Sequence, residues 1–226
     1  MNTLDELYKE CFIVSKDVEI QEYKDVFYLK NVFEDPHLVL KFQNLLSKWE
    51  SCSTAKPGLM TLTLPYWTAN YVQKQLFDYE CSWDDSQTEF IYFYWNNECQ
   101  DSNKDDLRSN NCLLPHTDSD PSRNSFIFLV NLNEKSVRTG FWKFNGNRIC
   151  KNFQEVDEYA EYAVSITEEN LDKKTNNGIL DKEGEIEYAF NEAIIYPSNR
   201  YHQPIIDKFY TRDNPRILLR YCYDKL

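Results

Sequence analysis

The chain has 226 residues, which is enough for one good-sized domain with a continuous core. Its content of 42% hydrophobic and 15% aromatic residues excludes a disordered chain, and its five glycines exclude a collagen-like one. The net charge of −12 disfavours nucleic acid and anionic membrane surfaces as partners, because binding to phosphate groups needs clustered Lys and Arg.

Seven cysteines are scattered along the chain, and no two of them form a C-x-x-C pair. We therefore expect reduced thiols rather than a disulfide framework or a structural zinc site. The N-terminal segment lacks a basic region followed by an apolar run, and no stretch approaches the roughly 20 apolar residues of a membrane span. These features predict a soluble, cytoplasmic protein.

The first elements along the chain are a strand over residues 25–33, a helix that Pro36 opens, and a second helix around 68–79. From residue 89 the pattern changes to short segments rich in aromatic and β-branched residues, which are typical of strands: 89–96, 125–133, 139–144, 185–190, 192–197 and 216–223. This order predicts an α+β, mainly β fold, in which a helical layer covers one face of a β-sandwich or barrel. We expect a single domain over 1–226, with a helical part over 1–88 and a β core over 89–226.

A long polar stretch over residues 145–184 interrupts the predicted strands and contains one expected short helix, EVDEYAEYAV. Long insertions between the strands of a barrel are often lids or binding loops. A solvated acidic excursion is the alternative, and the sequence does not choose between the two.

Two of the three histidines lie where predicted strands end. His116 stands in LLPHTDSDP, two residues before Asp118, and His202 stands in IIYPSNRYHQP. On an extended segment His116 and Asp118 point to one face, and His202 would complete three ligands on one side of a metal. Mixed nitrogen and oxygen ligands with open positions suit Fe(II) oxygen chemistry. H-x-D alone is a weak signal of a metal site, because His and Asp also occur in turns. We expect the third histidine, His37, to be a surface or capping residue.

The last predicted strand carries two arginines with period-two spacing. One face would hold Arg216, Leu218, Arg220 and Cys222, and the other Ile217, Leu219, Tyr221 and Tyr223. The second set is suited to packing under helices, whereas the first puts arginines inside the barrel. A buried Arg needs an anion, which a dicarboxylate co-substrate would supply through a bidentate pair. A structural Asp or Glu partner is the alternative.

The runs HTD, TGFW, YPSNRYH and PRILLRY together resemble the 2-oxoglutarate- and Fe(II)-dependent dioxygenase superfamily, and most of all its small prolyl-hydroxylase-like members from bacteria and phages. This resemblance implies a double-stranded β-helix, or jelly roll, with flanking N-terminal helices. It also implies that His116, Asp118 and His202 bind the iron and that Arg216 binds the distal carboxylate of 2-oxoglutarate.

The chain departs from the superfamily pattern near Arg216. The polar residue usual two positions later is Leu218, and the interval from His202 is longer than usual, so Arg212 or Arg220 could take the role. A tyrosine from the strand before the triad often assists in this superfamily, and Tyr92 and Tyr94 are the candidates here.

The implied activity is hydroxylation of a C–H bond with Fe(II), O₂ and 2-oxoglutarate, the last being converted to succinate. Asp118 argues against the halogenating variant, in which a small residue replaces the carboxylate. A peptidyl side chain, an amino acid and a small metabolite all remain open as substrates, as does the oligomeric state. The alternatives are a catalytically silent jelly-roll module and a facial-triad iron enzyme that does not use 2-oxoglutarate.

Overall fold

The computed structural model describes residues 3–46, 49–51, 58–61, 64–65, 67–78, 87–93, 118, 125–144, 180–205, 209–210 and 213–223. The helices are α1 (Leu4–Cys11), α2 (Pro36–Leu45) and α3 (Trp67–Phe77). The strands are β1 (Glu19–Tyr23), β2 (Val26–Lys30), β3 (Trp49–Ser51), β4 (Gly58–Thr61), β5 (Gln87–Phe93), β6 (Phe126–Asn131), β7 (Val137–Phe144), β8 (Leu180–Tyr188), β9 (Ala193–Pro197), β10 (His202–Ile205) and β11 (Arg216–Tyr223).

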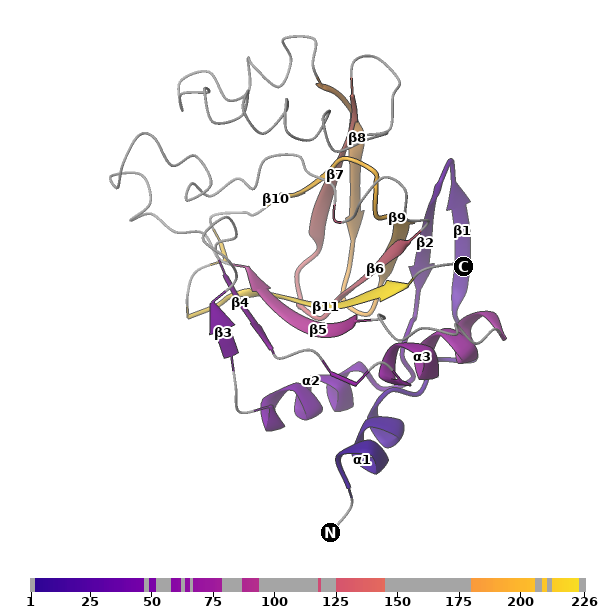
Figure 1. Ribbon diagram of the computed structural model, residues 1–226, viewed down its shortest axis with the longest axis vertical. Coiled ribbons are helices and arrows are strands. Elements are labelled where there is room, and N and C mark those ends of the chain that lie inside the picture. The colour runs from indigo at the N-terminus through magenta and orange to yellow at the C-terminus, as the bar shows by residue number, and fades with distance from the viewer. Residues whose placement is uncertain are drawn as a thin grey trace.

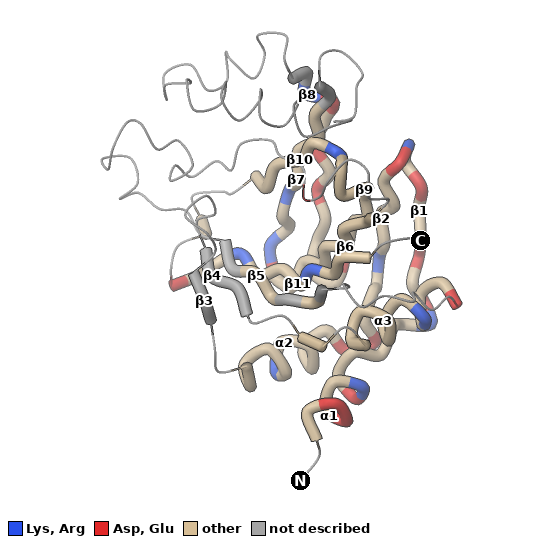
Figure 2. The backbone as a smooth tube through the Cα atoms, in the orientation of Figure 1, with Lys and Arg blue, Asp and Glu red and all other residues tan. Residues whose placement is uncertain are grey.

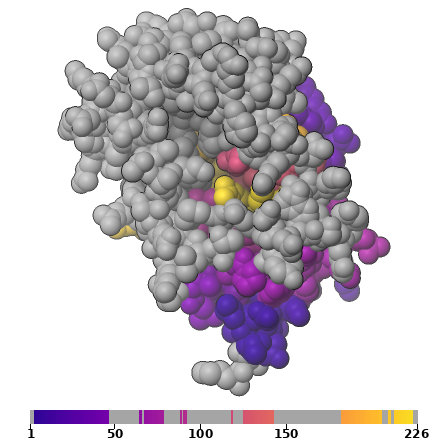
Figure 3. Space-filling model, in the orientation of Figure 1, coloured from indigo at the N-terminus to yellow at the C-terminus, as the bar shows by residue number. Residues whose placement is uncertain are grey.

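The described strands form two antiparallel sheets. The larger has eight strands in the order β1-β2-β9-β6-β11-β5-β4-β3, and the smaller has three in the order β10-β7-β8. Figure 1 shows the three helices together on one side of the larger sheet, with β7, β8 and β10 on the other side. In the space-filling view of Figure 3, indigo N-terminal residues lie at the lower end of the molecule, and purple ones are also seen on its right-hand side.

Local signals explain where the first helices begin. Thr3 and Glu6 form a reciprocal capping box at α1, and Asp35 accepts hydrogen bonds from two backbone N–H groups at the start of α2. Pro36 occupies the first turn of α2, where its missing N–H has no helical partner to lose. The apolar faces of these helices then become buried against the larger sheet.

Two hydrophobic clusters lie on the two faces of the larger sheet. The cluster on the helix side joins residues of α1, α2 and α3 to β11 residues Leu219, Tyr221 and Tyr223. The cluster between the sheets contains Leu218 of β11 together with residues of β6, β7, β8 and β9. The alternation predicted for 216–223 is therefore confirmed, and it turns Arg216 and Arg220 towards the space between the sheets.

The expectation of a mainly β fold with helices on one face is confirmed. The finer expectation of a double-stranded β-helix stays a prediction, as do the domain limits. The N-terminal part is less helical than expected, since β1 to β4 lie within it and join the larger sheet. Strand β8 begins at Leu180, inside the expected insertion 145–184.

Two expected features lie outside the described residues: the short helix in 155–164 and most of the insertion. Among the helices that the structure does describe, none is both long and apolar enough to cross a membrane.

Candidate functional site

Asp118 and His202 lie together, although 84 positions separate them in the sequence. The Nε2 atom of His202 is 3.5 Å from Oδ2 of Asp118, and both side chains are nearly inaccessible to solvent. The backbone explains this approach: the N–H of Asp118 donates to the carbonyl of Ser198 at 2.8 Å, just before the turn that leads into β10. Ser198 in turn is joined to Ser125 through its backbone N–H and its hydroxyl.

The imidazole of His202 is oriented by its second nitrogen. Nδ1 lies 3.0 Å from the backbone carbonyl of Arg200. A carbonyl only accepts hydrogen bonds, so Nδ1 is the donor in this contact, and Nε2 is the ring nitrogen that faces Asp118. Metal-binding histidines are commonly held in this way, with the other ring nitrogen donating to a carbonyl or carboxylate.

The spacing of these two side chains fits a shared metal ion. Two ligands about 2.1 Å from one ion are roughly 3.0 Å apart in an octahedral site and about 3.4 Å apart in a tetrahedral one. The 3.5 Å between Nε2 and Oδ2 is close to that range, and one nitrogen with one oxygen is the mixed set that iron accepts. His116 lies outside the described residues, and within the residues that are described no group of three metal-binding side chains occurs. The structure thus brings together two of the three predicted ligands.

Arg216 is completely buried between the sheets. Its Nη2 donates to the hydroxyl of Tyr188 at 3.0 Å, and its Nη1 makes a long 3.4 Å contact with the carbonyl of Ile205. Its Nε is buried and has no hydrogen-bond partner in the described part of the chain. The hydroxyl of Tyr188 also meets Oγ1 of Thr139 at 3.2 Å, which holds the phenol in place. A buried cation with a spare donor is suited to binding an anion.

Arg220 occupies a different place from Arg216. Its Nη1 is 3.8 Å from Oδ2 of Asp118, the same oxygen that faces His202. Arg220 therefore offsets the charge of the carboxylate, while Arg216, four residues earlier in β11, lies next to Tyr188. Arg212 lies outside the described residues.

The side chains of the two tyrosines predicted to assist lie outside the described part of the structure. Tyr94 is outside the described residues. In the ladder between β5 and β11, Tyr92 pairs with Ile217, whereas Arg216 pairs with Phe93 and Arg220 with Glu89. Their assignment stays a prediction.

Tyr196 is a site residue that sequence reasoning missed. Its ring centroid is 4.8 Å from that of His202 and 5.3 Å from that of Phe141, and its buried hydroxyl has no hydrogen-bond partner among the described residues. Burial, followed by the nearby Asp118 carboxylate, raises the pKa of Tyr196 well above its ordinary value, and Arg220 and Arg216 partly oppose this. Tyr196 therefore stays a neutral phenol among the charged groups of the site. The sequence feature that could have indicated Tyr196 is its position six residues before His202.

Comparisons with known proteins give distant likenesses. No known family model matches the chain, and no curated protein matches its sequence. Among solved structures, SnoN, a non-heme alpha ketoglutarate dependent epimerase from nogalamycin biosynthesis, is 9% identical, with a TM-score of 0.44 and coverage of 98% of this chain and 82% of SnoN. SnoK, a carbocyclase from the same biosynthesis, is 7% identical, with a TM-score of 0.46 and coverage of 99% and 86%. An oxidoreductase of the 2OG-Fe(II) oxygenase family from Burkholderia pseudomallei is 10% identical, with a TM-score of 0.34 and coverage of 98% and 75%. At these values the likeness does not assign the chain to a family.

Proposed function

We propose that this chain is a non-haem Fe(II), 2-oxoglutarate-dependent oxygenase of the hydroxylase type, built on a jelly roll. The observation that carries the proposal is the pairing of Asp118 with the Nε2 atom of His202, 3.5 Å apart. Arg220, 3.8 Å from Asp118, lies on the same strand and the same face as the buried Arg216, so this pair is on the side of β11 that carries the buried cation. A carboxylate–imidazole pair and a buried cation are the two features that an iron and a dicarboxylate require.

His116, Asp118 and His202 would hold the iron. When bound, Fe(II) supplies the oxygen chemistry that couples decarboxylation of 2-oxoglutarate to succinate with hydroxylation of a substrate C–H bond. The Arg200 carbonyl keeps the proton of His202 on Nδ1, so Nε2 is available as a ligand. Arg220, 3.8 Å from Asp118, offsets the negative charge that this carboxylate brings into a buried space.

Arg216 would bind the distal carboxylate of 2-oxoglutarate. Nε is a spare donor next to an Nη2 already oriented by Tyr188, so the planar guanidinium can meet a carboxylate with little loss of freedom. Arg212 and Arg220 were the alternatives. Arg220 faces Asp118 instead, and this favours Arg216.

Tyr196 and Phe141 would exclude water from the reacting centre. Both rings are almost completely buried, and the Tyr196 ring lies against His202. A dry wall strengthens the electrostatic contacts inside the site and protects reactive species from side reactions. The substrate we propose is a peptidyl side chain, an amino acid or a small metabolite. The net charge of −12 disfavours a nucleic acid as the substrate.

The proposal is tested by succinate release. The purified protein is supplied with Fe(II), ascorbate, O₂ and 2-oxoglutarate, alone and with pools of peptides, amino acids and metabolites. We expect slow succinate release that a substrate stimulates, and its loss in Asp118→Asn and Arg216→Met. Arg138→Met is the matched control, because Arg138 forms a more exposed ion pair with Glu185 on the smaller sheet. Iron uptake without succinate would favour a facial-triad enzyme that does not use 2-oxoglutarate, and failure to take up iron would favour a silent module.

A further inference from the structure

Arg200 lies in the turn between β9 and β10, two residues before His202. Its backbone N–H closes the turn by donating to the carbonyl of Pro197 at 3.0 Å. Its own carbonyl accepts from Nδ1 of His202. The guanidinium is nearly buried, with 8% of the side chain exposed. The same residue thus touches His202 through its backbone and reaches into the protein through its side chain.

The guanidinium of Arg200 is held from three sides. Nη2 is 2.7 Å from a carboxylate oxygen of Glu183 in β8, and Nη1 pairs with Asp25, between β1 and β2. Its central carbon lies 4.8 Å from the ring centroid of Phe141 in β7. Phe141 is directly opposite His202 in the β7–β10 ladder, so one side-chain contact of Arg200 is with the residue that pairs with His202.

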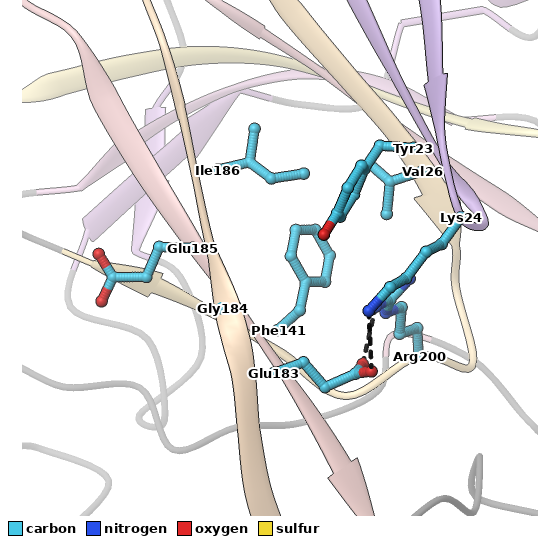
Figure 4. A pocket seen from close by; sticks show the side chains of 9 residues that line it. All are labelled: Tyr23, Lys24, Val26, Phe141, Glu183, Gly184, Glu185, Ile186 and Arg200. Atoms are coloured by element: carbon cyan, nitrogen blue, oxygen red, sulfur yellow. Dashed lines mark hydrogen bonds and ion pairs between the residues drawn. The ribbon is translucent and has the colours of Figure 1, made fainter.

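Arg200, Glu183 and Phe141 line a cavity of about 160 Å³, and Figure 4 shows Glu183 pointing towards both Lys24 and Arg200. Lys24 is 4.0 Å from Glu183, so the second cation adds only a weaker contact. The tip of the β1–β2 hairpin carries residues of both charges (Figure 2). The hairpin at the edge of the larger sheet is thereby tied to the smaller sheet.

The arrangement has a physical consequence for the backbone. Burial lowers the pKa of Arg200 from its ordinary value, but a guanidinium keeps its proton at physiological pH. Its charge must therefore stay paired, and two charge-assisted hydrogen bonds to different elements leave the planar group few orientations. A fixed guanidinium restricts the Cα of Arg200 and hence the direction of its carbonyl.

We propose that Arg200, clamped by Asp25 and Glu183, is the positioning residue that sets the tautomer and ring orientation of His202. The inference rests on the proposed function, because it assumes that Nε2 of His202 binds a metal. It assigns the clamp a role in metal affinity beyond joining the two sheets.

The test compares Arg200→Met, Glu183→Gln and Asp25→Asn with the wild type. Arg138→Met serves as control, because it breaks another ion pair to β8 without touching the His202 turn. The first readout is the protonation of the ring nitrogens in metal-free, ¹⁵N-histidine-labelled protein, where only three histidines give signals. We expect the Nδ1–H form of His202 in the wild type and in the control, and a mixture of tautomers in Arg200→Met.

The second readout is affinity for Co(II), a spectroscopic substitute for iron. Loss of a residue that orients a metal ligand commonly weakens metal binding about 10- to 100-fold, and we expect that range for Arg200→Met. Glu183→Gln and Asp25→Asn should also weaken Co(II) binding, but by a smaller factor. These two variants provide the test if Arg200→Met does not fold.

An unchanged His202 tautomer and unchanged Co(II) affinity in the folded variants would overturn the inference. Failure of the wild type to bind Co(II) would instead overturn the proposed function. In that case the tautomer in the metal-free protein still tests whether the clamp orients His202, so the two failures are distinguishable.

Discussion

Replacing the buried Arg216 by methionine should preserve or raise stability while removing 2-oxoglutarate binding. Arg216 is completely buried, and its hydrogen bonds are those to the Tyr188 hydroxyl at 3.0 Å and the Ile205 carbonyl at 3.4 Å. No carboxylate in the described part of the chain forms an ion pair with it. Methionine fills a similar volume without a charge, so the change avoids the cavity that alanine would leave.

The magnitude follows from two opposing contributions. Loss of the 3.0 Å hydrogen bond to a charged donor costs about 1.5–3 kcal/mol. Removal of a buried charge that forms no ion pair with the described carboxylates recovers a desolvation penalty of several kcal/mol. We therefore expect the free energy of unfolding of Arg216→Met to lie between that of the wild type and a value about 3 kcal/mol higher. For a chain of this size, each kcal/mol shifts the melting temperature by roughly 2–4 °C.

Urea unfolding measures the stability of both proteins, with an unchanged slope as the sign that both unfold from comparable states. A thermal shift with Co(II) and 2-oxoglutarate measures binding. At a hundred times its dissociation constant a ligand adds about 2.7 kcal/mol, and we expect this gain in the wild type but not in the variant. Destabilisation of Arg216→Met by more than about 2 kcal/mol would refute the reasoning, since it would mean that the arginine serves a structural ion pair.

Three further predictions concern capping, ionisation and the metal ligands. Asp35→Ala should lower the free energy of unfolding by about 0.5–2 kcal/mol in urea, because two backbone N–H groups at the start of α2 lose their acceptor; an unchanged midpoint would contradict this. Burial raises the pKa of Tyr8, so the stability that its protonated phenol contributes is present below about pH 10 and is lost as the pH rises. Above pH 10, the free energy of unfolding of Tyr8→Phe should therefore fall less steeply than that of the wild type, by about 1.4 kcal/mol per pH unit. Equal slopes in the two proteins would refute this. Asp118→Asn and His202→Gln should abolish stoichiometric iron uptake, measured by metal analysis, while the circular dichroism spectrum stays native; retained iron would remove both residues from the ligand set.

The sequence predicted best where burial imposes a simple period. Side chains of strand β11 point alternately into the helix-side cluster and into the space between the sheets, and the order of apolar and polar residues in the sequence predicted this. Strand β1 could not be predicted from the sequence, since all five of its side chains are exposed and its residues show no apolar alternation. Strand β10 has four residues and contains Pro204, and α1 is a helix of eight residues that buries only Tyr8. Such short elements depend on tertiary contacts rather than on local pattern.

Some residues of the candidate site could likewise be predicted from the sequence, and others could not. Asp118 and His202 could be named from residue type and motif, and a buried Arg216 from its place in the alternation. Tyr188 and Arg200 could not be named, because tyrosine and arginine are common in the chain and their roles depend on which residue lies opposite in a ladder. The contact of Arg200 with Asp25 spans 175 positions, and no local pattern encodes it.

The most direct test of the central claim is an anaerobic absorbance titration of the metal-free protein with Fe(II) and 2-oxoglutarate. The account predicts a weak visible charge-transfer band that needs both components, saturates at one iron per chain and is lost in Asp118→Asn and in Arg216→Met. Absence of both the band and iron uptake in the folded wild-type protein would contradict it.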